Sequence, residues 1–61
     1  MPNHTVIFKI TATFHKPSQF KGQPYYIHQE TDYTTSLEEL DQRYNELMIA
    51  EYIKSIQIDL T

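Results

Sequence analysis

The sequence contains no cysteine and no tryptophan, and it has only one glycine and one arginine. Without cysteine the chain forms no disulfide, and it lacks the commonest ligand of structural zinc. One glycine is too few for a phosphate-cradling loop, which needs several. No apolar run approaches the roughly 20 residues that a membrane span requires, and no charged-then-apolar leader opens the chain. These absences predict a cytoplasmic protein with no membrane partner.

With 61 residues, the chain has little interior. A domain of this length buries only about 60% of the surface that its unfolded chain exposes. Such domains are usually supported by disulfides, a structural metal or oligomerisation. Five tyrosines and three phenylalanines supply large side chains of a type that is favoured at protein interfaces. We therefore expect a single domain over residues 1–61 that associates as a homodimer.

Acidic residues are absent from the first half of the chain. Residues 1–29 carry three lysines and no acid, a charge of +3, whereas residues 30–61 carry eight acids against one arginine and one lysine, a charge of −6. This segregation suggests an interaction surface, although a solvated carboxylate face on a helix explains it equally well. Three lysines without an arginine fall short of a nucleic-acid-binding footprint, so no direct contact with nucleic acid is expected.

The hydrophobic pattern predicts three strands. Residues 5–14 alternate apolar and polar side chains and are rich in β-branched residues, which indicates a half-buried strand. Residues 15–24 contain proline and glycine and predict a hairpin loop of about ten residues. Residues 25–30 then form a second, antiparallel strand, followed by a polar turn over residues 31–36. Alternation returns in residues 52–60, which predict the last strand.

Residues 36–50 predict an amphipathic helix. Ser36 followed three residues later by Glu39 fits a capping box, and acidic residues in the first turns suit the positive end of the helix dipole. The apolar residues recur at spacings of three and four, which places them on one stripe: Leu37, Leu40, Tyr44, Leu47 and Met48. The expected fold class is therefore α+β with the order ββαβ, a three-stranded antiparallel sheet and one helix.

No arrangement of residues predicts catalysis. His4, His15 and His28 lie on separate predicted elements, without a pair at a metal-binding spacing. The serines fall in a loop, a helix cap and a strand, and none belongs to a nucleophile elbow. Three strands and one helix also offer little concavity for a substrate. We expect a protein that is not an enzyme and that uses no metal or cofactor.

Three stretches resemble one known family. The segment GQPYYIHQE, the capped acidic helix SLEELDQRYNEL and the closing EYIKSIQIDL are similar to the small uracil-DNA glycosylase inhibitors of certain Bacillus phages. The shared motifs are a Gly before a Tyr-Tyr strand, a Ser-Leu start to an acidic helix, a Tyr one turn beyond an apolar-acidic pair, and a late Glu-x-Ile-Lys. The resemblance covers residues 22–60 and requires a few inserted residues around residues 31–34.

The resemblance implies a dimer that mimics DNA and occupies the DNA-binding cleft of the host uracil-DNA glycosylase. Carboxylates take the place of backbone phosphates, which a DNA-binding surface attracts through basic groups and helix N-termini. An apolar pocket between the two helices takes the protruding minor-groove leucine of the enzyme. The implied partners are the glycosylase and a second copy of the chain, in the cytoplasm of the host cell.

The helix pattern of the family is acidic, aromatic, acidic, then Tyr three residues on, and it falls on Glu39, Leu40, Asp41 and Tyr44. Leu40 gives the pocket a smaller and more flexible wall than the aromatic would, and Asp41 is shorter than the expected Glu. The second acidic contact of the family falls on Ile27, for which Glu30 is the candidate replacement. The implied phosphate mimics are Glu30, Glu38, Glu39 and Asp41, and the implied pocket residues are Leu37, Leu40 and Tyr44.

Other interpretations stay open. In a simpler interpretation the apolar stripe belongs to the core and the acidic residues only keep the protein soluble. We favour this interpretation for Leu37 and Leu47. Leu40 and Tyr44 are better explained by a groove at a dimer interface, because symmetry brings two stripes together. The alternative functions are a small phage or bacterial protein that modulates another nucleic-acid enzyme or a defence factor, and a regulatory dimer without inhibitory activity.

Overall fold

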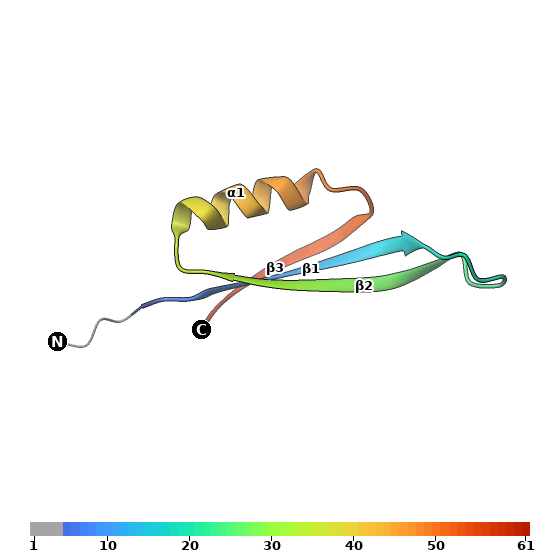
Figure 1. Ribbon diagram of the computed structural model, residues 1–61, viewed down its shortest axis with the longest axis horizontal. Helices are drawn as coiled ribbons and strands as arrows, with labels where there is room; N and C mark the ends of the chain where they lie inside the picture. Colours follow the sequence, from blue (N-terminus) through green and yellow to red (C-terminus); the bar gives the residue numbers. More distant parts are fainter. Residues whose placement is uncertain (1–4) are drawn as a thin grey trace.

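The sheet is built around its first strand. The computed structural model describes residues 5–61, in which β1 (Phe8–Pro17), β2 (Tyr25–Thr34) and β3 (Ile53–Leu60) form an antiparallel sheet with the order β2-β1-β3. Helix α1 (Leu37–Met48) lies on one face of this sheet and leaves the other face open (Figure 1). The predicted α+β class with the order ββαβ is confirmed.

The limits of the strands differ from those expected. β1 begins three residues later than predicted and continues to Pro17, and β2 continues to Thr34. The predicted turn over residues 31–36 is wrong for residues 31–34, because these pair with β1 as far as Phe8 opposite Thr34. Cross-strand pairing overrides the polar character of this segment, since strand preference depends mainly on neighbours in the sheet.

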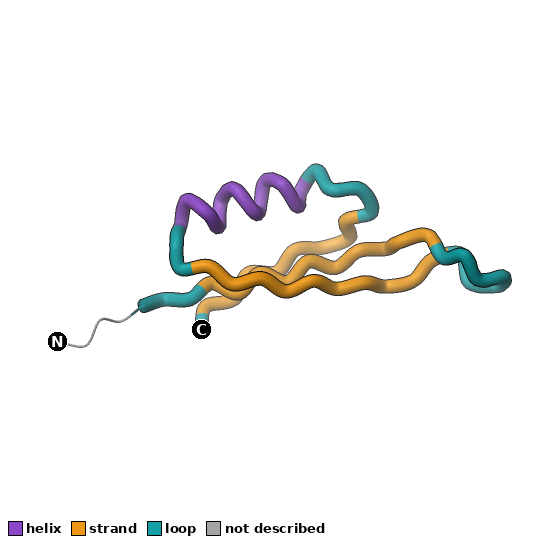
Figure 2. The backbone as a smooth tube through the Cα atoms, in the orientation of Figure 1, coloured by secondary structure: helices purple, strands orange, loops and turns teal. Residues whose placement is uncertain are grey.

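β1 and β2 form a long hairpin whose end projects beyond the other elements (Figure 2). The connection is shorter than the predicted ten-residue loop, because the strand continues through residues 15–17. The Ser18 amide donates to the Pro24 carbonyl at 3.0 Å, and the Ser18 hydroxyl accepts from the Phe20 amide at 3.1 Å. Gly22 has a φ of 89°, a left-handed conformation that glycine adopts without a steric cost.

The core comes almost entirely from β1. Ile10 and Ala12 are 2% exposed and Phe14 is 6% exposed. They alternate along the strand and therefore point to the same face of the sheet, toward α1. By contrast, α1 has no buried residue of its own. The opposite face of the sheet mixes polar side chains with exposed Ile27 and Tyr33. On this face the Gln29 amide donates to the Thr13 hydroxyl across the strands at 3.2 Å.

The ends of the helix follow local signals. The Ser36 hydroxyl accepts a hydrogen bond from the Glu39 amide at 3.2 Å, so the predicted cap residue is confirmed. The helix ends at Met48, two residues before the predicted end. A short turn follows in which Tyr52 has a φ of 69°, an uncommon conformation for a residue with a side chain. Among residues 5–61, no helix is long and apolar enough to cross a membrane.

The folded chain leaves an unusually large surface. Its accessible area is 5116 Å², whereas a compact monomer of 7.3 kDa exposes about 4200 Å². The radius of gyration is 14.9 Å, compared with about 10.5 Å for a compact domain of this length. Much of the exposed surface is apolar: Leu37 is 71% exposed and Leu60 is 69% exposed. Exposed apolar side chains that form a contiguous patch often mark an interaction site.

Candidate functional site

Helix α1 divides its face of the sheet into two sides. Toward β2, a cleft of about 440 Å³ lies between the helix and the sheet. Toward β3, the helix and the strand border a smaller hollow of about 290 Å³. The two sides differ in chemistry, because carboxylates line the first and mainly apolar side chains line the second.

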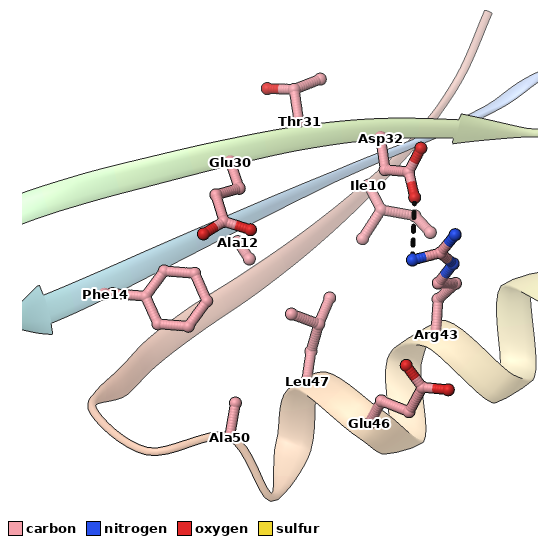
Figure 3. Close-up of a pocket in the computed structure, with 10 residues that line it drawn as sticks. All are labelled: Ile10, Ala12, Phe14, Glu30, Thr31, Asp32, Arg43, Glu46, Leu47 and Ala50. Atoms are coloured by element: carbon pink, nitrogen blue, oxygen red, sulfur yellow. Dashed lines mark ion pairs between the residues drawn. The ribbon is translucent and has the colours of Figure 1, made fainter.

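The cleft toward β2 has an apolar floor and charged walls (Figure 3). Glu30 and Asp32 alternate with Thr31 on β2, so both carboxylates point toward the helix. Core residues of β1 form the floor between these carboxylates and the charged side chains of α1. The lining consists of Ile10, Ala12, Phe14, Glu30, Thr31, Asp32, Arg43, Glu46, Leu47 and Ala50.

Ion pairs neutralise only part of this cleft. The Arg43 guanidinium lies 3.4 Å from the Asp32 carboxylate and 4.0 Å from that of Glu39. A hydrogen bond of 3.1 Å, which is not counted among these ion pairs, joins the His28 ring nitrogen and the Glu30 carboxylate. Each of these side chains is about half exposed, and such pairs contribute about 0–1 kcal/mol to stability. Among the lining residues, three acids face one arginine, so the cleft attracts cationic groups.

The hollow toward β3 collects the residues predicted for the apolar pocket. Its lining consists of Leu37, Leu40, Asp41, Tyr44 and Ile58. The structure therefore brings all three predicted apolar residues together and places one predicted carboxylate at their side. Ile58 was not selected from the sequence, although its alternation with Gln57 and Asp59 marks it as facing the helix. In the single chain the hollow is shallow and open to solvent.

The predicted phosphate mimics do not form one cluster. Glu38 and Glu39 border a broad depression on α1 that also includes Arg43 and Glu46. Glu30 lies in the cleft toward β2, whereas Asp41 lies on the β3 side of the helix. The acidic surface thus continues around the helix rather than lying on one side of it.

Two further carboxylates belong to this surface, and the sequence reasoning missed both. Asp32 lies two residues after Glu30, and Glu46 lies seven residues after Glu39. These spacings place each pair on one face of its strand or helix. The strand and helix periodicities are therefore sufficient to identify Asp32 and Glu46, provided that the strand is known to extend to residue 34.

Glu30 and Ile27 lie on opposite faces of β2. They are three residues apart, and successive side chains of a strand alternate between its faces. Ile27 pairs with His15 on the open face of the sheet, while Glu30 pairs with Ala12 on the helix face. Glu30 therefore joins Asp32 and the helix carboxylates and does not occupy the side on which Ile27 lies.

The histidines of the described chain lie apart from one another. His15 packs against Tyr25 with ring centres 4.8 Å apart, and His28 lies beside Phe14 on the other face of the sheet. His4 is outside the described residues. Within residues 5–61, no group of three or more His, Cys, Asp or Glu side chains is arranged to hold a metal ion.

Models of known protein families, curated proteins and solved structures were compared with the chain, and none matched. The acidic surface, the apolar hollow and the free edges of the sheet are therefore the observations from which a function is inferred.

Proposed function

We propose that the protein inhibits uracil-DNA glycosylase by mimicking DNA, as a homodimer and without catalysing a reaction. The observation that carries this proposal is the acidic surface along α1 and β2. It holds six carboxylates and a single cation, Arg43, and these carboxylates are Glu30, Asp32, Glu38, Glu39, Asp41 and Glu46. Basic side chains and helix N-termini that bind phosphates attract carboxylates for the same electrostatic reason.

The proposed dimer forms at the β3 edge of the sheet. β3 has no neighbour on its outer side, and an unpaired edge favours addition of another strand. Two copies related by a twofold axis would bring their hollows together, which deepens the pocket lined by Leu40 and Tyr44 and covers Leu60.

The mechanism requires no chemistry on a bound substrate. Negative charge segregated on one surface speeds encounter with a basic cleft. Once bound, the carboxylates pair with the groups that would hold DNA phosphates, and the apolar pocket receives a protruding side chain of the enzyme. The DNA-binding cleft is then occupied and no cofactor or metal is involved.

The test is uracil excision from a labelled single-stranded oligonucleotide by a bacterial uracil-DNA glycosylase. We expect excision to stop near one dimer per enzyme, and Asp41→Ala and Tyr44→Ala to weaken the block. Glu51→Ala is the matched control, because it removes the same charge from an exposed turn outside the acidic surface. Undiminished excision at large molar excess of the protein contradicts the proposal.

A second candidate is an inhibitor of another nucleic-acid enzyme. Leu40 and Ile27 stand where the resembling family has an aromatic and an acid, and such differences at a binding surface alter the choice of partner. A pull-down from bacterial lysate distinguishes the candidates. Recovery of a glycosylase supports the first, recovery of a different DNA enzyme or a defence factor supports the second, and recovery of neither favours a regulatory dimer.

A further inference from the structure

The end of the β1–β2 hairpin has a charge opposite to that of the helix. Lys16 and Lys21 lie at this end, and no acid occurs between residues 5 and 29. The first carboxylate along the chain, that of Glu30, interacts with His28 at 3.1 Å. The projecting part of the molecule in Figures 1 and 2 therefore carries two lysines and no acid, whereas the acids lie on β2, on α1, in the turn after α1 and near the end of β3.

Exposed aromatic rings lie among these lysines. Phe20 is 78% exposed at the tip, and Tyr26 is 46% exposed on the neighbouring strand. They border a hollow of about 410 Å³, within the size range of ligand sites. Its lining combines aromatic rings with amide side chains: Pro17, Ser18, Gln19, Phe20, Gln23 and Tyr26.

One lysine is positioned on the same side as this hollow. Lys16 pairs directly with Tyr26 in the β1–β2 register, so the two side chains point to the same face of the sheet. The Lys16 ammonium lies 5.5 Å from the centre of the Phe14 ring, which keeps it near the sheet. Lys21 follows Phe20 directly in the loop. Tyr26 therefore has a lysine opposite it across the strands, and Phe20 has one directly after it in the chain.

We propose that this hairpin end binds single-stranded nucleic acid. Bases stack on Phe20 and Tyr26, and the phosphates that join them lie near Lys16 and Lys21. Aromatic rings combined with cationic side chains are the means by which proteins bind single strands without strict sequence preference. The Gln19 and Gln23 amides supply both donors and acceptors for base edges.

The composition of the tip favours a single strand over other ligands. In a duplex the base faces are already stacked on one another and do not reach an aromatic ring. Residues 15–24 contain no Leu, Ile, Val or Met, so Phe20 is the one large apolar side chain of the loop. A single such side chain buries little area in a lipid surface, and binding there scales with that area. The sequence-based expectation of no nucleic-acid contact counted lysines over half the chain, but the fold places two of them at one end. The inference does not depend on the proposed function.

The test is fluorescence anisotropy with a short labelled oligo(dT) and with a duplex of equal length, at several salt concentrations. We expect tighter binding to the single strand, and about tenfold weakening by Phe20→Ala and by Tyr26→Ala. The salt dependence has an expected slope of about −1.4 for two phosphates, and Lys21→Gln reduces it to about −0.7.

Two matched controls separate the tip from the rest of the molecule. Tyr33→Ala removes an exposed tyrosine from the same strand, about 24 Å from Tyr26 at the rise of an antiparallel strand. Lys54→Gln removes an exposed lysine from β3. Both are expected to leave binding unchanged. Circular dichroism checks the fold of each variant, and Phe20→Ala and Lys21→Gln decide the test if Tyr26→Ala unfolds the chain.

Several results would overturn the inference. These are no binding to oligo(dT) at low salt, equal or tighter binding to the duplex, and binding that survives Phe20→Ala. Equal weakening by the control Tyr33→Ala would overturn it as well. Binding of the hairpin to anionic lipid vesicles, without binding to oligo(dT), would assign the tip to a membrane surface instead.

Discussion

The apolar residues of β1 and those of α1 differ in their exposure to solvent. On β1, Ile10 and Ala12 are 2% exposed, and of its apolar residues only Phe8 is half-buried. On α1, no residue is buried, Leu37 is 71% exposed, and Leu40 and Leu47 are half-buried. A stripe of apolar residues on a helix normally indicates core. In this chain the central strand provides most of the core, and the role proposed for the exposed part of the helix stripe is association.

Ile10→Ala tests the part of the comparison that concerns the fold. We expect a loss of about 2–5 kcal/mol in the free energy of unfolding, because the substitution leaves a cavity in a small core. Urea denaturation followed by circular dichroism measures it. A matched Leu37→Ala should cost far less when measured at low protein concentration, where association does not contribute. Similar costs for the two substitutions would mean that the helix stripe is core as well.

Leu60→Glu tests the proposed interface at the β3 edge. Leu60 is 69% exposed, so the fold of the single chain should tolerate a charge there. In the dimer the two glutamates would be desolvated near the twofold axis, and we expect dissociation to monomers. Sedimentation at several concentrations measures the shift. The control is Tyr33→Glu on the far strand, and an unchanged dimer in Leu60→Glu would place the interface elsewhere.

Ser36→Ala tests how α1 is held. The Ser36 hydroxyl accepts a hydrogen bond from the Glu39 amide at 3.2 Å, and loss of such a cap costs about 1 kcal/mol. A lower thermal midpoint is expected. Ser36→Asp should retain stability, because Asp also caps helices, whereas equal loss in both variants would indicate that the hydroxyl has another role.

Arg43→Gln should have the smallest effect on stability. Its pairs with Asp32 and Glu39 are half exposed and contribute about 0–1 kcal/mol. The substitution removes the only cation from the lining of the acidic cleft, so association with a basic partner should become faster and more dependent on salt. Stopped-flow binding measures this. A slower association would show that Arg43 itself contacts the partner.

Some features of β1, β2 and α1 are predictable from the sequence and others are not. The order of elements and the start of α1 depend on local signals, alternation and the Ser36 cap, and both were predicted. The end of β2 was not, because polar residues such as Thr31 and Asp32 become strand only through pairing with β1. The position of Ile58 beside Leu40 and Tyr44 depends on how the helix crosses the sheet. Helical periodicity defines a stripe, but it does not define which strand the stripe faces.

Glu39 and Asp41 lie on different sides of α1, and this too depends on how the helix crosses the sheet. Both lie on one short stretch of α1, but Glu39 faces Arg43 while Asp41 borders the hollow toward β3. The sequence indicates that both are exposed acids. Only the position of the helix over the sheet assigns them to different sides.

The most direct test of the proposed DNA mimicry is a competition measurement. The glycosylase is mixed with the Phe20→Ala/Lys21→Gln variant, which lacks the proposed single-strand contacts of the hairpin end, and with a labelled uracil-containing single strand. The species are separated by size-exclusion chromatography with light scattering. We predict a complex of one dimer per enzyme that excludes the oligonucleotide. A ternary complex, in which the enzyme holds the protein and the oligonucleotide at the same time, would contradict the account, as would the absence of any complex with the enzyme.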